Sequence, residues 1–568
     1  MVVEVLKGDK HRFDYWCQLV RPSLAQPIAA ELDRQLWQVL DATVGFKVPR
    51  GNQEEDGDCI LSVPVPGWER KHFSEWVVRQ PIQLHGAGFR SHEDTCLPAY
   101  LGALEQAAPF MSKLPVLEDI LGGEAAWGEE ADQGLRWAPL LQSGQRDGAE
   151  LWSGWEALQL EGRRSATFVQ EVVEGPLTVD VRGAGSDGAG TLRQRLTEGR
   201  EKLRGKVLLR ALELHPNRAA RPVWSWKERD KLSTAWLLCL PGPTSPLSSA
   251  EFSEAFAALL CAPSPACHPR LGEPVAGRRI VDKFGDNVVN ATMRGDGWRS
   301  RHDKMKLCLR SLLIWAGIPV TCEVFNLFAD CIPQAGLARI ERGRRRQGLV
   351  PDFKIQGEQG EGDVLCELKC MSASASRYPH NPRDGIRAVD RRADGLSADY
   401  ARKAVKVDQE YGGTPVPGQR IPGAPAPPRV VGRVEARLLT FGRIHGWCFG
   451  AWGEASSEVH ELVQRLATSR LEIVDQQPDT YGPPKSQAAQ LAGLVGYVRR
   501  RLSFTAVQQQ ARLLLNRLQL LGEGANVAAA RRDKAVLEEA SALRERRAQY
   551  VCLRQGISIL RRGFGHLD

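Results

Sequence analysis

Residues Leu349–Met371 read LVPDFKIQGEQGEGDVLCELKCM, and this segment carries the clearest structural signal in the chain. It contains two apolar runs, Leu349–Ile355 and Asp363–Met371, and the residues between them, Gln356–Gly362, are all glycine, glutamine or glutamate. Short apolar runs on either side of a polar, glycine-rich turn are typical of a β-hairpin. We therefore predict two neighbouring antiparallel strands here.

The predicted hairpin carries three charged side chains that could form a site. Side chains alternate along a strand, so Glu367 and Lys369 are predicted on one face and the apolar residues around them on the other. The turn would bring Asp352, on the first strand, beside Glu367. Two carboxylates, a main-chain carbonyl and a phosphate oxygen are plausible ligands of a hard cation such as Mg²⁺, and an amine could orient the attacking water. The simpler alternative is a solvated hairpin with an ordinary cross-strand ion pair.

Further elements are predicted on both sides of the hairpin. Before it, apolar residues at three- and four-residue steps predict a helix over His302–Trp315, and Val320–Leu327 is a strand candidate. After it, we predict a charged helix near Ser397–Tyr411, a strand run over Val434–Trp447 and an amphipathic helix over Ser456–Ala467. The hairpin is therefore expected to lie within a core of mixed helix and sheet.

This order of elements, with Pro-Asp on one strand and Glu-x-Lys on the next, resembles the PD-(D/E)xK restriction-endonuclease-like superfamily. The resemblance implies an α/β (α+β) restriction-endonuclease-like core with a mixed central sheet, flanked by mostly α-helical N- and C-terminal regions. It implies that Asp352, Glu367 and Lys369 are catalytic, with the two acids binding Mg²⁺ or Mn²⁺ and the lysine assisting the water. Many members add an acidic residue from before the Pro-Asp strand; Glu323 is the candidate here and Asp303 the second choice.

Basic residues flank the predicted hairpin on both sides. Arginine and lysine clusters offer phosphate contacts, which would give salt-sensitive and largely sequence-independent binding. The alternative is a solvated face, because aspartates interleave the second cluster. We predict a nucleic-acid partner, DNA first and RNA second. The residues expected to contact it are Arg339, Arg342, Arg344, Arg345 and Arg346 before the hairpin and Arg377, Arg402, Lys403 and Lys406 after it.

A second resemblance covers Gln80–Ala108, Glu228–Pro269 and the Arg-His-Asp triplet at 301–303. These segments look like the region that follows the reverse transcriptase in site-specific non-LTR retrotransposon proteins, where a cysteine/histidine knuckle precedes a restriction-like endonuclease that nicks target DNA. No polymerase motif is found in the chain. The resemblance implies a retroelement-derived nuclease with an intracellular, nuclear location.

Zinc is not expected, although that resemblance includes a knuckle. Cys267, His268 and His302 could be its remnants, but Gly285–Arg301 has no cysteine or histidine where further ligands belong. The 13 cysteines of the chain include no CxxC pair, so neither a regular zinc module nor a disulfide framework is predicted.

Composition sets outer bounds on these interpretations. The chain has 568 residues, with 76 Lys+Arg against 68 Asp+Glu and a formal net charge of +8. This excess is too thin to prove a nucleic-acid partner, so the local clusters matter more. Apolar residues make up 42% and charged residues 25%, which excludes wholesale disorder, collagen-like and coiled-coil classes. No long apolar run is present, so neither a signal peptide nor a membrane span is expected.

The length suggests roughly two to four domains. We predict an endonuclease domain at the centre, preceded by helical and linker-rich regions and followed by a basic tail. The predicted boundaries are 1–121 for a helical region resembling a post-polymerase thumb or linker segment, 122–224 for a linker-rich region with a basic helix, 225–271 for a helical connector, 272–467 for the endonuclease domain with a Pro-rich insertion at 412–428, 468–488 for a linker and 489–568 for the basic helical tail.

The leading functional hypothesis is a metal-dependent DNA endonuclease. A catalytically inactive protein that keeps only nucleic-acid binding is the second, and steep salt dependence without cleavage would favour it. A third is a nucleotide-dependent enzyme that uses the GxGxxG of Gly183, Gly185 and Gly188. That motif lacks an acidic residue at the end of a second strand, so a loop is the preferred interpretation.

Overall fold

The computed structural model describes about half of the chain. The described residues are 22–50, 60–62, 70–82, isolated positions between 86 and 103, 145–147, 178–180, 201, 231–239, 247–276, 279–291, 293, 297–323, 327–336, 349–357, 362–374, 376–379, 386–411, 431–475 and 486–522. The predicted Pro-rich insertion at 412–428 and the GxGxxG glycines lie outside them.

A four-stranded mixed sheet lies at the centre of the described part. Its strands are β7 (Val320–Cys322), β8 (Phe353–Ile355), β9 (Val364–Cys370) and β10 (His445–Phe449), in the order β10-β9-β8-β7. The first three form an antiparallel meander, and β10 pairs with β9 in parallel. The hairpin predicted from the sequence is therefore confirmed as β8 and β9.

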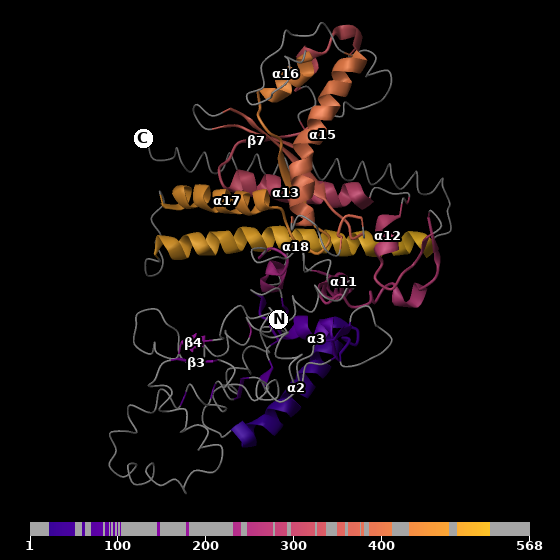
Figure 1. Ribbon diagram of the computed structural model, residues 1–568, viewed down its shortest axis with the longest axis vertical. Helices are drawn as coiled ribbons and strands as arrows, with labels where there is room; N and C mark the ends of the chain where they lie inside the picture. Colours follow the sequence, from indigo (N-terminus) through magenta and orange to yellow (C-terminus); the bar gives the residue numbers. More distant parts are fainter. Residues whose placement is uncertain are drawn as a thin grey trace, which may run out of the picture.

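Helices cover both faces of this sheet (Figure 1). α13 (Gly297–Trp315) contacts β7 and β9, and α17 (Ser457–Asp475) contacts β10. α15 (Ala388–Tyr411) lies against β10 and packs with α16 (Arg433–Leu439). The molecule thus belongs to a mixed class of helix and sheet in which helices predominate.

Two apolar clusters fix the sheet between these helices. On one face, Cys366 and Leu368 of β9 pack with residues of α13 and α17, among them Leu309 and Val463. On the other face, Leu365 packs with residues of α15 and α16. Because successive residues of β9 enter opposite clusters, the predicted alternation along this strand is confirmed. Burying a leucine or phenylalanine in this way contributes about 1.5–3 kcal/mol per side chain.

The long helix α18 (Gln487–Gly522) joins the sheet to the rest of the described chain. It runs alongside α13 and α17 and also contacts η3 (Ala235–Leu238), α11 (Ser249–Leu259) and α12 (Asp286–Asn290) (Figure 1). The segment expected as a basic tail therefore begins with a helix that is packed along the molecule. The second helix expected in that segment, over Val527–Tyr550, lies outside the described residues.

The N-terminal elements pack against the same body. α2 (Pro22–Val44) contacts α11, and α3 (Phe73–Arg79) contributes Phe73 and Trp76 to a buried cluster shared with α11 and α15. The remaining elements are short: β1 (Ile60–Ser62) with β2 (Arg70–His72), β3 (Gln145–Asp147) with β4 (Thr178–Asp180), β5 (Pro274–Val275) with β6 (Arg279–Ile280), and the 3-10 helices η4 (His268–Arg270) and η5 (Ala329–Cys331).

One sequence prediction in this core is wrong. The strand expected over Val434–Trp447 is the helix α16 followed by the strand β10. Val434 and Leu438, four residues apart, are both buried, and the carboxylate of Asp408 accepts hydrogen bonds from the first N–H groups of α16. A short apolar run of this kind does not distinguish helix from strand by itself. No helix in the described part of the chain is long and apolar enough to cross a membrane.

Candidate functional site

The hairpin places two carboxylates next to each other at the start of β8. Phe353 pairs with Cys366, so Asp352 and Glu367 occupy the next positions of the antiparallel register. Asp352 Oδ2 accepts a hydrogen bond of 3.0 Å from the main-chain N–H of Leu368. Asp352 and Glu367 are only 8% and 6% exposed. The two predicted metal-binding acids therefore lie at neighbouring positions of adjacent strands, and both are buried.

Glu367 is held by one side chain from its own strand and one from α15. The Tyr400 hydroxyl donates to Glu367 Oε2 at 2.6 Å, and the Lys369 ammonium donates to Glu367 Oε1. Burial and the charge of Glu367 raise the pKa of Tyr400, so its hydroxyl remains a donor at neutral pH. The Lys369 side chain is 32% exposed. The predicted acid and amine therefore share one face of β9, and the amine is accessible to solvent.

Asp352 is held from the other side by α13. His302 Nε2 lies 3.1 Å from Asp352 Oδ2, and Lys306 Nζ lies 4.0 Å from Oδ1. Burial disfavours the charged form of Asp352, but hydrogen bonds from His302 and Leu368 and the nearby cations outweigh it and lower its pKa. Burial likewise opposes protonation of His302, yet its hydrogen bonds to Asp303 and Asp352 raise its pKa to about 9. At neutral pH, a histidinium therefore faces a carboxylate.

Two further acids, Glu323 and Asp303, contact the same lysine that lies near Asp352. Lys306 Nζ lies 2.5 Å from Glu323 Oε1 and 3.6 Å from Asp303 Oδ1. The main-chain N–H of Glu323 donates to Asp352 O at 3.1 Å, which extends the β7–β8 pairing by one residue. Both acids proposed as the additional member, Glu323 and Asp303, thus lie at this end of the sheet. They contact Lys306.

The donor chemistry of Asp352 and Glu367 fits a hard divalent cation. Carboxylate oxygens are the ligands that Mg²⁺ prefers. Each ionised carboxylate offers about four lone-pair positions, so the hydrogen bonds described above do not exhaust either group. Within the described residues, no three His, Cys, Asp or Glu side chains are already arranged to hold a metal ion. Any ion here would complete its ligand set with main-chain, water or substrate oxygens.

The residues considered as a zinc knuckle lie in different surroundings. His302 contacts Asp303 and Asp352. Cys267 is buried in an apolar cluster with Val288 and Leu514, and this burial raises the pKa of its thiol to about 11. His302 and Cys267 therefore pack in two different parts of the structure.

Four of the predicted nucleic-acid contacts lie within the described residues. Arg402 pairs with Asp399 and Lys406 with Glu410, both within α15. Lys403 Nζ lies over the Tyr400 ring at 5.0 Å. Pairing within one helix is what the solvated-face alternative predicts. The fourth residue, Arg377, is exposed and donates to Ser372 Oγ at 2.5 Å, shortly after β9. The predicted contacts Arg339, Arg342, Arg344, Arg345 and Arg346 fall outside the described residues.

Sequence reasoning missed Tyr400 and Lys306 and considered His302 only as a zinc remnant. Each of these side chains meets an acid that lies between 17 and 50 residues away in the chain. Spacing along the sequence carries no signal for such contacts, because they depend on how α13 and α15 pack on the sheet. The buried positions of Tyr400 and Lys306 on their helices could only indicate that these residues face inward.

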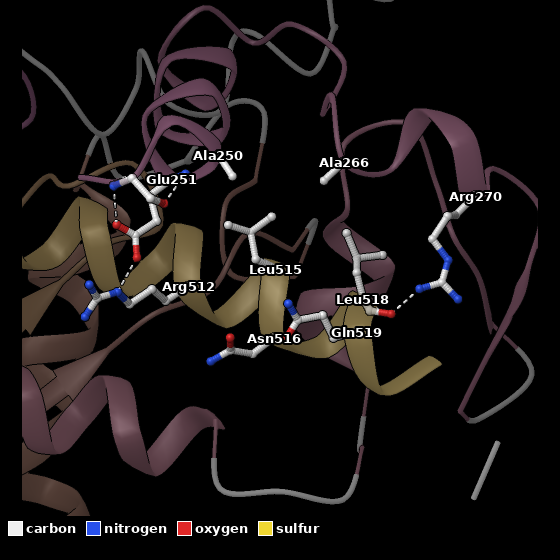
Figure 2. A pocket seen from close by; sticks show the side chains of 10 residues that line it. Ala250, Glu251, Ala266, Arg270, Arg512, Leu515, Asn516, Leu518 and Gln519 are labelled. Carbon is white, nitrogen blue, oxygen red and sulfur yellow. Dashed lines mark hydrogen bonds and ion pairs between the residues drawn. The ribbon is translucent and has the colours of Figure 1, made fainter. Parts of the chain in front are cut away.

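A separate hollow of about 390 Å³ lies between α11, η4 and α18 (Figure 2). Its two arginines are already engaged. Arg512 donates to Glu251, and Arg270 pairs with Glu273 at 2.6 Å and donates to Leu518 O. None of the carboxylates of the hairpin lines this hollow.

Compared with models of known protein families and with curated protein sequences, the chain matches none.

Proposed function

We propose that the protein is a metal-dependent DNA endonuclease of the restriction-endonuclease-like class, derived from a non-LTR retroelement. The observation that carries this proposal is that Asp352 and Glu367 occupy neighbouring positions directly after the Phe353–Cys366 pair of a mixed sheet, with Lys369 on the same face as Glu367. The order of elements supports it: α13, then the β7–β8–β9 meander, then α15, then β10 parallel to β9. The order from α13 to α15 is the one that the resemblance to PD-(D/E)xK enzymes implies.

In this proposal, Asp352 and Glu367 hold one Mg²⁺ or Mn²⁺ ion. When bound, the ion would act as a Lewis acid on the scissile phosphate. The Lys369 ammonium, free to leave Glu367 Oε1, orients the attacking water and offsets phosphate charge. Tyr400 keeps the Glu367 carboxylate in place, and the Leu368 N–H does the same for Asp352.

The proposed partner is DNA, with RNA as the other candidate, and the proposed location is the nucleus. Of the four predicted contacts that lie within the described residues, Arg377 and Lys403 support the proposal most, because Arg402 and Lys406 form ion pairs with acids of α15. Contacts of arginine and lysine with phosphates would make binding weaken steeply as salt rises.

The test is nicking of supercoiled plasmid DNA by the full-length chain with Mg²⁺ or Mn²⁺. Lys369→Ala should reduce the nicking rate by about 100-fold or more, which is the usual cost of removing a group that stabilises charge in the transition state. Lys354→Ala is the matched control, because Lys354 is a lysine of the same hairpin that pairs with Asp363 at 2.6 Å. It should nick at the wild-type rate. Chelating the metal should stop both proteins.

A second candidate is a binding protein without catalysis. The observation that favours it is that Asp352, Glu323 and Glu367 each already contact a cation of the chain. Salt-sensitive DNA binding with no cleavage under either metal would support this candidate and contradict the endonuclease. Equal nicking by wild type and Lys369→Ala would remove the role assigned to Lys369.

A further inference from the structure

Lys306 is the point at which three acids of the proposed site meet. Its ammonium lies 2.5 Å from Glu323 Oε1, 3.6 Å from Asp303 Oδ1 and 4.0 Å from Asp352 Oδ1. Asp303 belongs to α13, Glu323 directly follows β7, and Asp352 directly precedes β8. The Lys306 side chain is only 11% exposed, so its charge is poorly screened by water.

The backbone at Glu323 supports this arrangement. Glu323 has a φ of +52°, in the left-handed region that residues with a side chain rarely adopt. Such a conformation is unfavourable for a residue other than glycine, because the Cβ atom lies too close to the following carbonyl oxygen. It occurs at the one residue whose N–H extends the pairing to Asp352 and whose carboxylate contacts Lys306. A contact between the two charges is the clearest compensation for that cost.

Basic side chains of α13 surround the carboxylates of Asp303, Glu323 and Asp352. Lys306 contacts all three acids, whereas His302 contacts Asp303 and Asp352, and Arg299 contacts only Asp303, at 3.6 Å. Removing the Lys306 charge would therefore remove the cation that Glu323 shares with Asp303 and Asp352, while His302 and Arg299 would still face the other two acids.

We propose that the Lys306 ammonium stands in the place of a second divalent cation, so that the site takes one metal ion, on Asp352 and Glu367, and not two. Lys306 is then a positioning residue that holds Asp352 and Glu323 together. This inference rests on the proposed function, because it concerns the metal stoichiometry of the same site. Two-metal nucleases use the second ion to stabilise the leaving oxygen. In a site with one metal ion, the protein itself would have to supply the positive charge that stabilises the leaving oxygen.

The experiment is calorimetric titration of the full-length chain with Mn²⁺, without DNA. Wild type should bind one equivalent. Lys306→Met, which keeps the length of the side chain and removes its charge, should bind two, and its melting temperature should rise more with Mn²⁺ than that of wild type. Lys306→Gln is the second variant, because it keeps a hydrogen-bond donor for Glu323, and it should also bind two. Lys306→Arg and Lys354→Met are the controls and should each bind one.

The outcomes separate this inference from the proposed function. If wild type binds one equivalent that Glu367→Gln removes, and both neutral Lys306 variants still bind one, the endonuclease proposal stands and the role of Lys306 is overturned. In another outcome, wild type binds no Mn²⁺, whereas Lys306→Met binds one equivalent that remains when Glu367→Gln is added. That result would support the role of Lys306 and contradict the metal site on Asp352 and Glu367. Two equivalents in wild type, or none in any variant, would overturn the inference.

Discussion

At the scale of single residues, the phenol of Tyr400 holds the Glu367 carboxylate from the side of α15. Its hydroxyl donates to Glu367 Oε2 at 2.6 Å, and the residue is 1% exposed. We expect Tyr400→Phe to lower the free energy of unfolding by about 1–3 kcal/mol, because a buried carboxylate loses a hydrogen bond. It should also weaken Mn²⁺ affinity by about 10-fold or more, as loss of a group that orients a metal ligand usually does.

Urea unfolding and a Mn²⁺ titration measure the two effects of Tyr400→Phe. The matched control is Tyr411→Phe, which removes a phenol from the same helix about 16 Å further along its axis. The control should keep the metal affinity of wild type. A Tyr400→Phe protein with unchanged metal affinity would contradict the positioning role, whatever its stability.

The residues of the candidate site differ in how well the sequence predicted them. Asp352, Glu367 and Lys369 could be predicted because a hairpin and the alternation of a strand are local, and the register of β8 and β9 brings Asp352 beside Glu367 as expected. Tyr400 and Lys306 could not, since their partners are set by helix packing across many residues. The local pattern thus predicts which acids meet, and tertiary packing decides which side chains hold them.

At the scale of elements, the contact between α15 and β10 determines how closely Tyr400 approaches the sheet. Gly446 of β10 pairs with Glu367, and a Cβ added at Gly446 would lie 2.6 Å from Ala393 Cα of α15. Real side chains do not tolerate that distance to main-chain atoms, so Gly446→Ala must push α15 away. We expect a loss of about 1–3 kcal/mol in the free energy of unfolding, together with weaker metal binding.

Gly395→Ala is the control for this contact. Gly395 also lies on α15, but an added Cβ there would meet nothing within 4 Å. It should leave metal binding unchanged and stabilise the protein by up to about 1 kcal/mol, since alanine favours helix over glycine. The two variants are compared by urea unfolding. If Gly446→Ala is as stable as Gly395→Ala, the close packing of α15 on β10 is not needed.

The elements themselves were predictable to different degrees. The β8–β9 hairpin and the helices α13 and α15 have long or strongly patterned sequences, and each is present, with α13 and α15 beginning earlier than predicted. α16 was predicted as strand, because its seven residues are apolar on one side and are capped by Asp408 of α15 rather than by a neighbour in sequence. A cap supplied by another helix leaves no local signal.

At the scale of the whole molecule, stability should depend on pH through His445 of β10. Burial and the nearby Arg443 lower the pKa of His445 below its ordinary value of 6.5. α17 faces the same ring with Glu458, whose carboxylate is 3.7 Å away and also pairs with Arg443, and with Glu461 and Arg465. The folded protein therefore keeps this histidine neutral at pH values where the unfolded chain protonates it.

The direction of the pH effect follows from proton uptake. Well above pH 6.5, His445 is neutral in both states and contributes nothing. As the pH falls through 6.5, the unfolded chain takes up a proton that the folded protein resists, so this residue lowers stability progressively until its folded pKa is reached. His445→Gln removes this proton uptake, so the variant should lose less stability between about pH 7.5 and about pH 5.5 than wild type does. The measurement is the free energy of urea unfolding at both pH values, with His460→Gln on α17 as the control. An equal loss in wild type and His445→Gln would show that β10 and α17 accommodate the charged ring, and that the packing between them does not exclude a proton.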